Sequence, residues 1–353
     1  PFNHNKKEEK LMKKLLAILL TLTLVFGVAS AMAEGIKLGI VTPDADHGFT
    51  GESVAHARAE AEALKASGAI EDYMMAVGNE ASKQIQGIEE ILNWGPDAIM
   101  LWPNEGDQLR NAAQTIVDEK IPLVIYDRLI ENFTGMAAEI MGDNVKIGNM
   151  MGEYLLKYFE EDLKAGKEIK YLLFIGDSST VSKQRTQGML DVIDATEYKD
   201  QFVLLQDGFQ TDWSNAKAKE LMENWLSTAD AATIADLDLI VTHDDEIIDG
   251  LMQVIPEETG LTDLRILTSV GGRRETLATF DNIEKPELLT YFFSPSYIRE
   301  AIRLTVAAAK GETYQGQEIK GQQFLIPTIE IDKNTVEAYR NSQEFADRYS
   351  LDN

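Results

Sequence analysis

Short apolar runs alternate with longer amphipathic segments along almost the whole chain. Ten runs of strand length are rich in Ile, Leu and Val, which is typical of parallel strands that are buried on both faces. The segments between them carry apolar residues three or four positions apart, the spacing of a helix that packs one face on a core. The alternation therefore predicts an α/β fold of parallel sheets flanked by helices. The predicted strands are residues 36–42, 72–77, 97–102, 121–126, 169–175, 201–206, 237–242, 264–270, 288–293 and 323–331.

The number of strands and the chain length indicate two lobes. Ten strands are more than one lobe usually holds, and 353 residues are enough for two lobes of ordinary size. The first four strands are expected in one sheet, and the strands from 169 to 293 mostly in the other. No Pro/Gly/Ser-rich linker separates the halves, and the join near residues 140–146 is short. We therefore expect two sheets connected by crossing segments.

The N-terminal residues have the features of an export signal. The positive stretch 12–14 precedes an apolar stretch at 15–28, and Ala31-Met32-Ala33 matches a small-residue cleavage site. The apolar stretch is about fourteen residues long, short of the ~20 that a spanning helix needs. We therefore expect a signal peptide at 12–33 and a vector-like upstream extension at 1–11. Export to a periplasm is favoured, and secretion from a single-membrane cell is the alternative.

Charge and cysteine content narrow the function classes. The formal net charge is −26 and no basic stripe is visible, which argues against nucleic-acid binding. The chain contains no cysteine, which excludes disulfides, thiolate metal sites and a cysteine-linked lipid anchor.

Polar and aromatic side chains follow nearly every predicted strand at its C-terminal end. Open α/β sheets hold ligands at this edge. Planar polar groups can pair with neighbouring hydroxyls, and rings can pack on the C–H faces of a sugar. Together these side chains predict a polyhydroxylated ligand held between the lobes. The candidate ligand-binding residues are His47, Phe49, Thr50, Asn104, Asp127, Arg128, Arg185, Trp213, Asp244, Arg273 and Phe293.

Few side chains form a motif that is typical of an enzyme active site. Residues 243–246, His-Asp-Asp-Glu, could ligate a metal, but a capped helix start is favoured because consecutive residues rarely all face one ion. The Gly-Asp-Ser-Ser stretch at 176–179 is similar to a serine-hydrolase block but has no downstream Asp-x-x-His partner. The phosphate-binding glycine motifs are missing. We therefore expect no enzyme activity, no metal and no cofactor.

Four segments together resemble a known family. They are IPLVIYDR, GNMMGEYL, the R-x-x-G-M of Arg185 to Met189, and VTHDDEIIDGL. The chain resembles, from about Ile36 to Tyr339, the type I periplasmic sugar-binding proteins of ABC transporters, the ribose- and galactose-binding group. The same fold serves as the effector domain of lac-repressor-type regulators, but the export signal and the absence of a basic helix-turn-helix argue against that class.

The resemblance implies two similar lobes joined by three crossings that close on one sugar. The expected N-terminal lobe is residues 34–143 plus 295–325, and the expected C-terminal lobe is 144–294 plus 326–353. The resemblance also implies roles for individual residues. It assigns first-loop contacts to His47, Phe49 and Thr50, an acidic–basic pair to Asp127 and Arg128, the second-lobe arginine to Arg185, the stacking ring to Trp213, and a polar ligand after strand seven to Asp244.

Two positions depart from the family pattern. An aspartate is usual after strand eight, where this chain has Arg273, and a glutamine is usual near strand nine, where it has Phe293. The surplus of arginines leaves a sugar acid, a polyol or a furanone-type signal open beside a plain aldopentose. Alternatively, Arg273 pairs with Asp244 or Asp245 and the pocket stays neutral.

The predicted function is that of a monomeric binding protein. It captures a small carbohydrate by hinge closure and delivers it to an ABC transporter permease. The alternative is a ligand sensor that docks on a chemoreceptor or sensor kinase.

Overall fold

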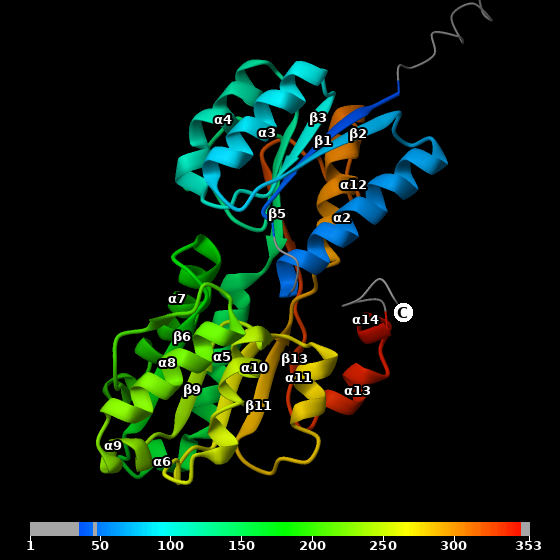
Figure 1. Cartoon of the computed structure of the whole chain (residues 1–353). Coiled ribbons are helices and arrows are strands. Elements are labelled where there is room, and N and C mark those ends of the chain that lie inside the picture. Colours follow the sequence, from blue (N-terminus) through cyan, green and yellow to red (C-terminus); the bar gives the residue numbers. More distant parts are fainter. Residues whose placement is uncertain (1–34, 45–47, 347–353) are drawn as a thin grey trace, which may run out of the picture.

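The computed structural model describes residues 35–44 and 48–346 and has two lobes, each built on its own sheet (Figure 1). The predicted signal peptide, the upstream extension and His47 lie outside the described residues. The first sheet has six strands in the order β12-β5-β4-β3-β1-β2, and all of its pairs are parallel. Its strands are β1 (Lys37–Thr42), β2 (Asp72–Val77), β3 (Ala98–Leu101), β4 (Leu123–Tyr126), β5 (Ala138–Gly142) and β12 (Gln322–Ile326).

The second sheet has seven strands in the order β13-β11-β10-β9-β6-β7, with β8 also paired to β6. Only β13 runs antiparallel, against β11. Two parallel-sheet α/β lobes confirm the predicted fold class. The strands are β6 (Ile169–Ile175), β7 (Phe202–Leu204), β8 (Phe209–Gln210), β9 (Leu239–Thr242), β10 (Ile266–Gly271), β11 (Glu287–Phe292) and β13 (Glu330–Ile331).

Helices cover both faces of the first sheet. Helices α3 (Ala81–Trp94) and α4 (Gly106–Asp118) pack on one face, where a separate apolar cluster lies. Helices α2 (Gly48–Ser67) and α12 (Tyr297–Lys310) pack on the other face (Figure 1). Strand residues are fully buried on both faces, as Leu38 and Val41 show. This explains why the strands read as continuous apolar runs in the sequence.

The second lobe carries more and shorter helices. Within residues 35–44 and 48–346, no helix is long and apolar enough to cross a membrane. The helices of this lobe are α5 (Asn144–Tyr158), α6 (Glu160–Lys164), α7 (Thr180–Asp194), α8 (Asn215–Thr228), α9 (Ala231–Ala235), α10 (Asp245–Leu251), α11 (Arg274–Thr279), α13 (Val336–Arg340) and α14 (Gln343–Ala346), with 3₁₀ turns at Lys199–Gln201 and Ile255–Glu257.

Two stretches differ from the sequence-based prediction. Strand β5 of the first sheet extends into the join expected near residues 140–146, and α5 of the second lobe begins directly after it. The single apolar run 323–331 forms two strands, β12 and β13, in different sheets. Pro327 lies between them, and a proline has no N–H with which to continue a ladder. Hydrophobicity alone could not reveal which sheet each half of this run would join.

The chain crosses between the lobes three times, and the crossings lie side by side. They run from β5 to α5, from β11 to α12, and from β12 to β13. Asp143 N donates to Ile326 O over 3.1 Å, and Phe292 N donates to Ile329 O over 2.8 Å. These bonds tie the crossings into one narrow bundle, visible between the lobes in Figure 1. The exact lobe boundaries at 143/144, 294/295 and 325/326 stay a prediction.

Candidate ligand-binding cleft

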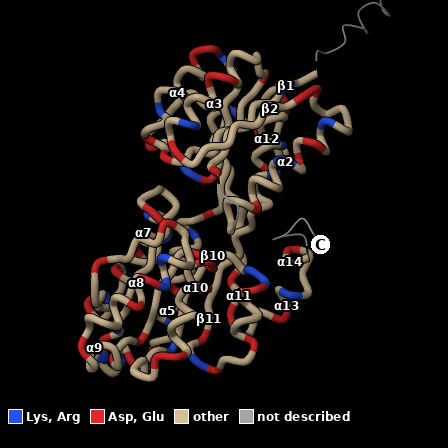
Figure 2. The backbone as a smooth tube through the Cα atoms, viewed as in Figure 1, with Lys and Arg blue, Asp and Glu red and all other residues tan. Residues whose placement is uncertain are grey.

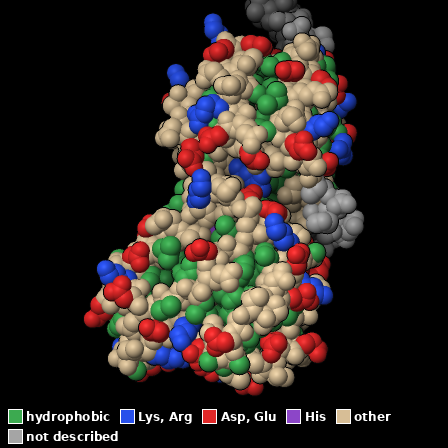
Figure 3. Space-filling model, turned by 60° about the vertical axis from the view of Figure 1, so that its left-hand side comes forward, with side chains coloured by type: hydrophobic (Ala, Val, Ile, Leu, Met, Phe, Trp, Pro, Cys, Tyr) green, Lys and Arg blue, Asp and Glu red, His purple; other side chains and the backbone are tan. Residues whose placement is uncertain are grey.

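A cleft of about 710 Å³ lies between the lobes, at the carboxyl ends of strands from both sheets. Figure 3 shows the molecule narrowing between the lobes at this level. Nine of the eleven candidate residues line the cleft: Phe49, Thr50, Asn104, Asp127, Arg128, Arg185, Trp213, Asp244 and Phe293. His47 lies outside the described residues, and Arg273 is not among the lining residues.

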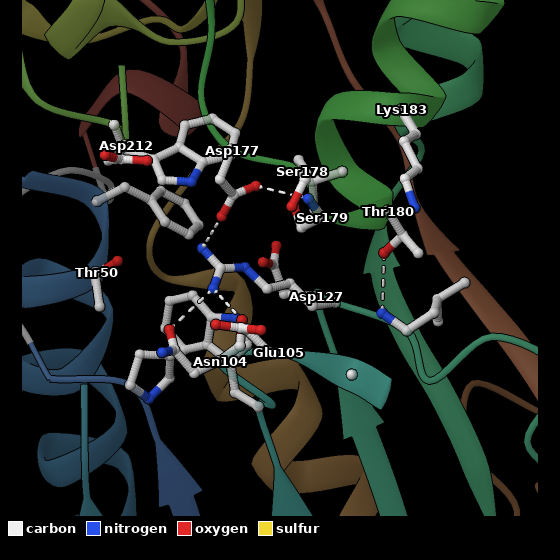
Figure 4. Close-up of a pocket in the computed structure, with 18 of the residues that line it drawn as sticks. Thr50, Asn104, Glu105, Asp127, Asp177, Ser178, Ser179, Thr180, Lys183 and Asp212 are labelled. Atoms are coloured by element: carbon white, nitrogen blue, oxygen red, sulfur yellow. Dashed lines mark hydrogen bonds and ion pairs between the residues drawn. The ribbon is translucent and has the colours of Figure 1, made fainter. Parts of the chain in front are cut away.

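Arg128 reaches from the first lobe to the second. Its Nη1 donates to the backbone oxygen of Asn104 over 2.7 Å and to Asn104 Oδ1 over 3.2 Å. Its Nη2 lies 3.1 Å from Asp177 Oδ2, at the end of β6 in the second lobe. Figure 4 marks these contacts with dashed lines. The guanidinium therefore uses its own lobe for hydrogen bonds and the opposite lobe for its counter-ion.

Asp127 is a buried carboxyl group at the centre of this wall. Its backbone has a φ of +63°, a left-handed conformation that directs the chain from β4 into the cleft loop. The side chain belongs to a residue that is only 5% exposed. Burial raises the pKa of Asp127, although the charges of Arg128 and Arg185 oppose the rise. Asp127 is thus a desolvated acid without an ion pair of its own among the described residues.

Arg185 is held inside the second lobe. Its Nε donates to Asn144 Oδ1 over 2.9 Å, and its Nη1 donates to the backbone oxygen of His243 over 2.5 Å. The guanidinium lies 4.6 Å from the ring centre of Phe293 and 5.9 Å from that of Trp213. Cations at such distances from ring faces are stabilised by the ring quadrupole. Neutral acceptors and aromatic faces therefore fix Arg185.

Close packing of two helices brings Arg185 next to Asn144. A Cβ on Gly148 of α5 would lie 2.4 Å from Arg185 O, and one on Gly188 of α7 would lie 2.7 Å from Val145 O. Since neither position has room for a side chain, the two backbones approach each other directly. The glycines in GNMMGEYL and in R-x-x-G-M are thus required for the geometry of the arginine.

Four aromatic rings form the apolar part of the cleft. The Phe49 ring centre lies 5.3 Å from that of Phe293 and 5.9 Å from that of Trp102. Trp213 lies flat against Gly176, where an added Cβ would be 2.2 Å from the indole. The rings come from both lobes. Such surfaces suit the C–H faces of a sugar or polyol.

The His-Asp-Asp-Glu segment is a capped helix start. Asp244 Oδ1 accepts from Glu246 N over 2.8 Å, which caps α10. Asp245 is fully buried and accepts from Ser269 Oγ, Thr290 Oγ1 and the backbone N–H groups of Gly272 and Arg273. Among the described residues no group of His, Asp and Glu side chains could hold a metal ion.

Burial changes the charge state of two neighbours in this segment. It lowers the pKa of His243 to about 3, helped by the nearby charge of Arg185, so the imidazole is neutral. It raises the pKa of Asp244 to about 7, helped by the like charge of Asp245. Asp244 faces the cleft and forms no ion pair among the described residues. A ligand group that donates to it would relieve this unfavourable charge.

Arg273 forms a network beside the cleft. Its Nη1 lies 2.7 Å from Glu246 Oε1 and 2.9 Å from Asp249 Oδ2. The sequence suggested either a ligand contact or a pair with Asp244 or Asp245. The side chain instead pairs with Glu246 and Asp249, and only its backbone N–H donates to Asp245. The helical turn of α10 brings Glu246 and Asp249 to the same side, which strand-end reasoning could not show.

Asp177 and Glu246 line the cleft but were not among the sequence-based candidates. Asp177 stands directly after β6, in a polar stretch for which only Arg185, on the following helix, was predicted to bind ligand. Its place at a strand end was the signal that could have identified it. Burial alone would raise its pKa, but Arg128 and hydrogen bonds outweigh this effect and lower it, so the carboxylate is charged.

Two further bonds join the lobes beside Arg128 and Asp177. Leu129 N donates to Thr180 Oγ1 over 3.1 Å, and Lys183 Nζ lies 3.3 Å from Glu131 Oε1. All of these bonds connect the loop after β4 with the N-terminal end of α7. The lobes are therefore held together along this side of the cleft by the protein itself.

Several donors in the cleft lack a protein acceptor. Trp102 Nε1, Trp213 Nε1 and Arg128 Nε are buried and have no hydrogen-bond partner among the described residues. The Trp102 indole points toward Asp127 and the Trp213 indole toward Asp177, and each lowers the pKa of its carboxyl group without a hydrogen bond of ordinary geometry. Buried donors without a partner are rare in native proteins, because each costs about 1–3 kcal/mol.

Comparisons with known proteins agree with this geometry. Residues 38–313 match the family model of the periplasmic binding protein domain. A D-xylose-binding periplasmic protein of Haemophilus influenzae is 22% identical over 273 residues, covering 75% of this chain and 77% of that protein. A ribose import binding protein of Bacillus subtilis is 24% identical over 219 residues, covering 60% of this chain and 65% of that protein.

The fold also matches solved structures. One is an ABC transporter solute binding protein from Bacillus halodurans with bound myo-inositol, with a TM-score of 0.71 and 18% identity. The match covers 88% of this chain and 99% of that one. At this identity the likeness concerns the fold.

Proposed function

The chain belongs to the periplasmic binding protein family, and on that premise we propose that it captures a monosaccharide or polyol between its lobes for an ABC transporter. The relatives with similar sequences are named as binding proteins for xylose and ribose, and a structural neighbour was solved with myo-inositol. All three compounds carry several hydroxyl groups. The proposal extends this ligand class to the present chain.

The observation that carries the proposal is the cleft lined from both lobes. Each wall offers rings and planar polar groups: Phe49, Asn104 and Asp127 on one side, Arg185 and Trp213 on the other. Rings cover the C–H faces of a sugar, and carboxylate, amide and guanidinium groups bind its neighbouring hydroxyls. The unpartnered indole N–H groups add donors for ligand oxygens.

Binding works by hinge closure. A ligand that touches both lobes is bound most tightly when they are closed, so it shifts the population toward the closed form. The three adjacent crossings between the sheets allow this movement without unfolding either core. Affinities at or below about 1 μM, roughly −8 kcal/mol, are expected for a receptor of this kind.

The same proposal includes the cellular setting. The protein is exported to the periplasm by residues 12–33, acts as a monomer, and presents the closed, loaded form to a membrane permease. No chemical change of the ligand is part of this function.

A thermal-shift screen of the purified protein against aldoses and polyols tests the proposal. A ligand that binds only the folded state raises the melting temperature by mass action. At 100 times its Kd, such a ligand adds about 2.7 kcal/mol to the free energy of unfolding. We expect a large shift with at least one neutral sugar or polyol, micromolar affinity in calorimetry, and recovery of the ligand unchanged. No shift with any of them, or turnover of a bound compound, would contradict the proposal.

A further inference from the structure

The cationic groups around the cleft are already engaged by the protein. Arg128 is paired with Asp177, Lys183 with Glu131, and Arg273 with Glu246 and Asp249. Arg185 donates to Asn144 and to the backbone of His243. An anionic ligand would have to displace a carboxylate from Arg128, Lys183 or Arg273, whereas the contacts of Arg185 to Asn144 and His243 are to neutral acceptors. For three of the four cationic side chains, an anion would therefore meet a group that a carboxylate already holds.

Carboxylates outnumber cations in the lining. The residues lining the cleft include nine Asp and Glu but only three Arg and Lys. Four of these carboxylates, Asp44, Glu105, Asp127 and Asp244, have no ion pair among the described residues. Burial raises the pKa of two of them, Asp127 from the first lobe and Asp244 from the second. Asp244 uses Oδ1 to cap α10, and no hydrogen bond reaches its Oδ2 among these residues. Arg185 is the nearby charge that both carboxyl groups share.

From this imbalance we propose that the cleft prefers a polyol carrying an ammonium group, such as an amino sugar or an aminocyclitol, over its neutral and anionic analogues. Asp244 is the residue that receives the ammonium, and Asp127 adds to the field from the opposite wall. This inference rests on the proposed function and names the ligand class within it.

Desolvation explains why a cation gains here. Bringing a carboxylate out of water is the main cost of a buried ion pair. Folding has already buried Asp127 and partly buried Asp244, and this burial raises the pKa of both carboxyl groups. A ligand ammonium therefore gains the attraction of both groups and loses only its own hydration. A hydroxyl at the same place gains a hydrogen bond but no net charge attraction.

Matched ligand triplets test the proposal by calorimetry at pH 8, where Asp244 is mostly ionised. The members of a triplet share one ring and differ in carrying a hydroxyl, an amino or a carboxyl group. The triplets are glucose, glucosamine and glucuronate, and the corresponding galactose and mannose sets. Myo-inositol and an aminocyclitol of the same ring form an additional pair. In at least one triplet we expect the amine to bind at least tenfold more tightly than the neutral member. We expect the acid to bind at least 100-fold more weakly than the amine.

The outcomes separate this proposal from the function it rests on. If a neutral member binds and its amine binds equally or more weakly, the charge preference is wrong and the proposed function stands. If an acid binds best, the charge preference is wrong as well. If no member of any triplet binds, both fail.

Two variants locate the charge that is recognised. Asp244→Asn keeps the shape and the helix cap but removes the charge, so the preference for the amine should fall to about twofold or less. Glu105→Gln removes a carboxylate from the exposed rim of the same cleft and should leave the preference unchanged, because water screens that position. An amine preference that survives Asp244→Asn, or that depends on Glu105, would overturn the assignment of Asp244.

Discussion

The two walls of the cleft hold their arginines in different ways. Arg128 in the first lobe takes its counter-ion, Asp177, from the second lobe. Arg185 in the second lobe is bound by Asn144 and the backbone of His243, both in its own lobe. Two arginines that line the same cleft, Arg128 just after β4 and Arg185 within α7, therefore have different physical roles.

Closure of the lobes affects the contacts of Arg128 but not the contacts of Arg185 to Asn144 and His243. The contacts of Arg185 to Asn144 and His243 lie within one lobe and persist when the lobes separate, so the second wall is preorganised for the ligand. The Arg128–Asp177 contact forms only when the lobes approach, so it contributes to the closed state directly. Substitutions on the two walls should consequently weaken ligand binding for different reasons.

Arg185→Ala should have the largest effect on binding, at least 100-fold in Kd by calorimetry with the best ligand of the screen. The substitution removes a charged donor and leaves Asn144 Oδ1 and a backbone oxygen without their partner, at about 1–3 kcal/mol of stability. The protein should still fold, as circular dichroism would verify. Arg185→Lys keeps the charge but not the planar guanidinium group, so its Kd should lie between those of the wild type and Arg185→Ala. Unchanged affinity in Arg185→Ala would show that the second wall does not bind the ligand.

Arg128→Ala and Asp177→Asn should each weaken binding about tenfold and favour the open form. Each breaks the ion pair between the lobes, and apparent affinity falls with the fraction of closed protein. Small-angle scattering of the ligand-free protein should report a larger radius of gyration for both variants. Arg185→Ala serves as the control here, because the hydrogen bonds of Arg185 to Asn144 and His243 lie within one lobe. An unchanged radius in all three would remove the proposed distinction between the walls.

Asp244→Asn should raise the free energy of unfolding of the ligand-free protein by about 1–3 kcal/mol at pH 8. The pKa of Asp244 is raised to about 7 in the folded state, above the usual value of an unfolded aspartate. The folded state therefore binds more protons between about pH 4 and 7, and stability falls as the pH rises through that range.

Urea denaturation of both proteins from pH 4 to 8 checks this prediction. The wild type and the variant should have similar stability near pH 4 and diverge as the pH rises. Comparing the two proteins cancels the opposite contribution of His243, whose pKa is lowered. A difference that does not depend on pH would show that Asp244 is not the titrating group.

Lys183→Ala should have the smallest effect, less than about 0.5 kcal/mol in stability and less than twofold in Kd. Lys183 and Glu131 also connect the lobes, but their side chains are 62% and 51% exposed. Exposed pairs contribute little because water screens them and the long side chains lose freedom. A loss as large as that of Arg128→Ala would mean that position between the lobes, and not burial, decides the strength of such pairs.

Much of the fold follows from local pattern. The apolar runs predicted most strands within a few residues, because buried parallel strands need apolar side chains on both faces. Strand β5 was missed because Ala138-Glu139-Ile140 is short and contains an acid. Nine of the eleven candidate residues line the cleft, because chain topology places strand ends at one edge. Asp177 was missed because only Arg185, on the following helix, was predicted to bind ligand among the polar residues after this strand.

The amino-acid sequence by itself determined the periodicity, the placement of rings and planar polar groups after strands, and the glycines that allow α5 and α7 to touch. These properties depend on a residue and its near neighbours. Only the tertiary structure decided that 323–331 divides between two sheets, that Arg128 pairs across the cleft, and that Arg273 pairs with Glu246 and Asp249. The partner of a charge depends on which distant segments packing brings within a few ångströms, and hydrophobic periodicity carries no information about that choice.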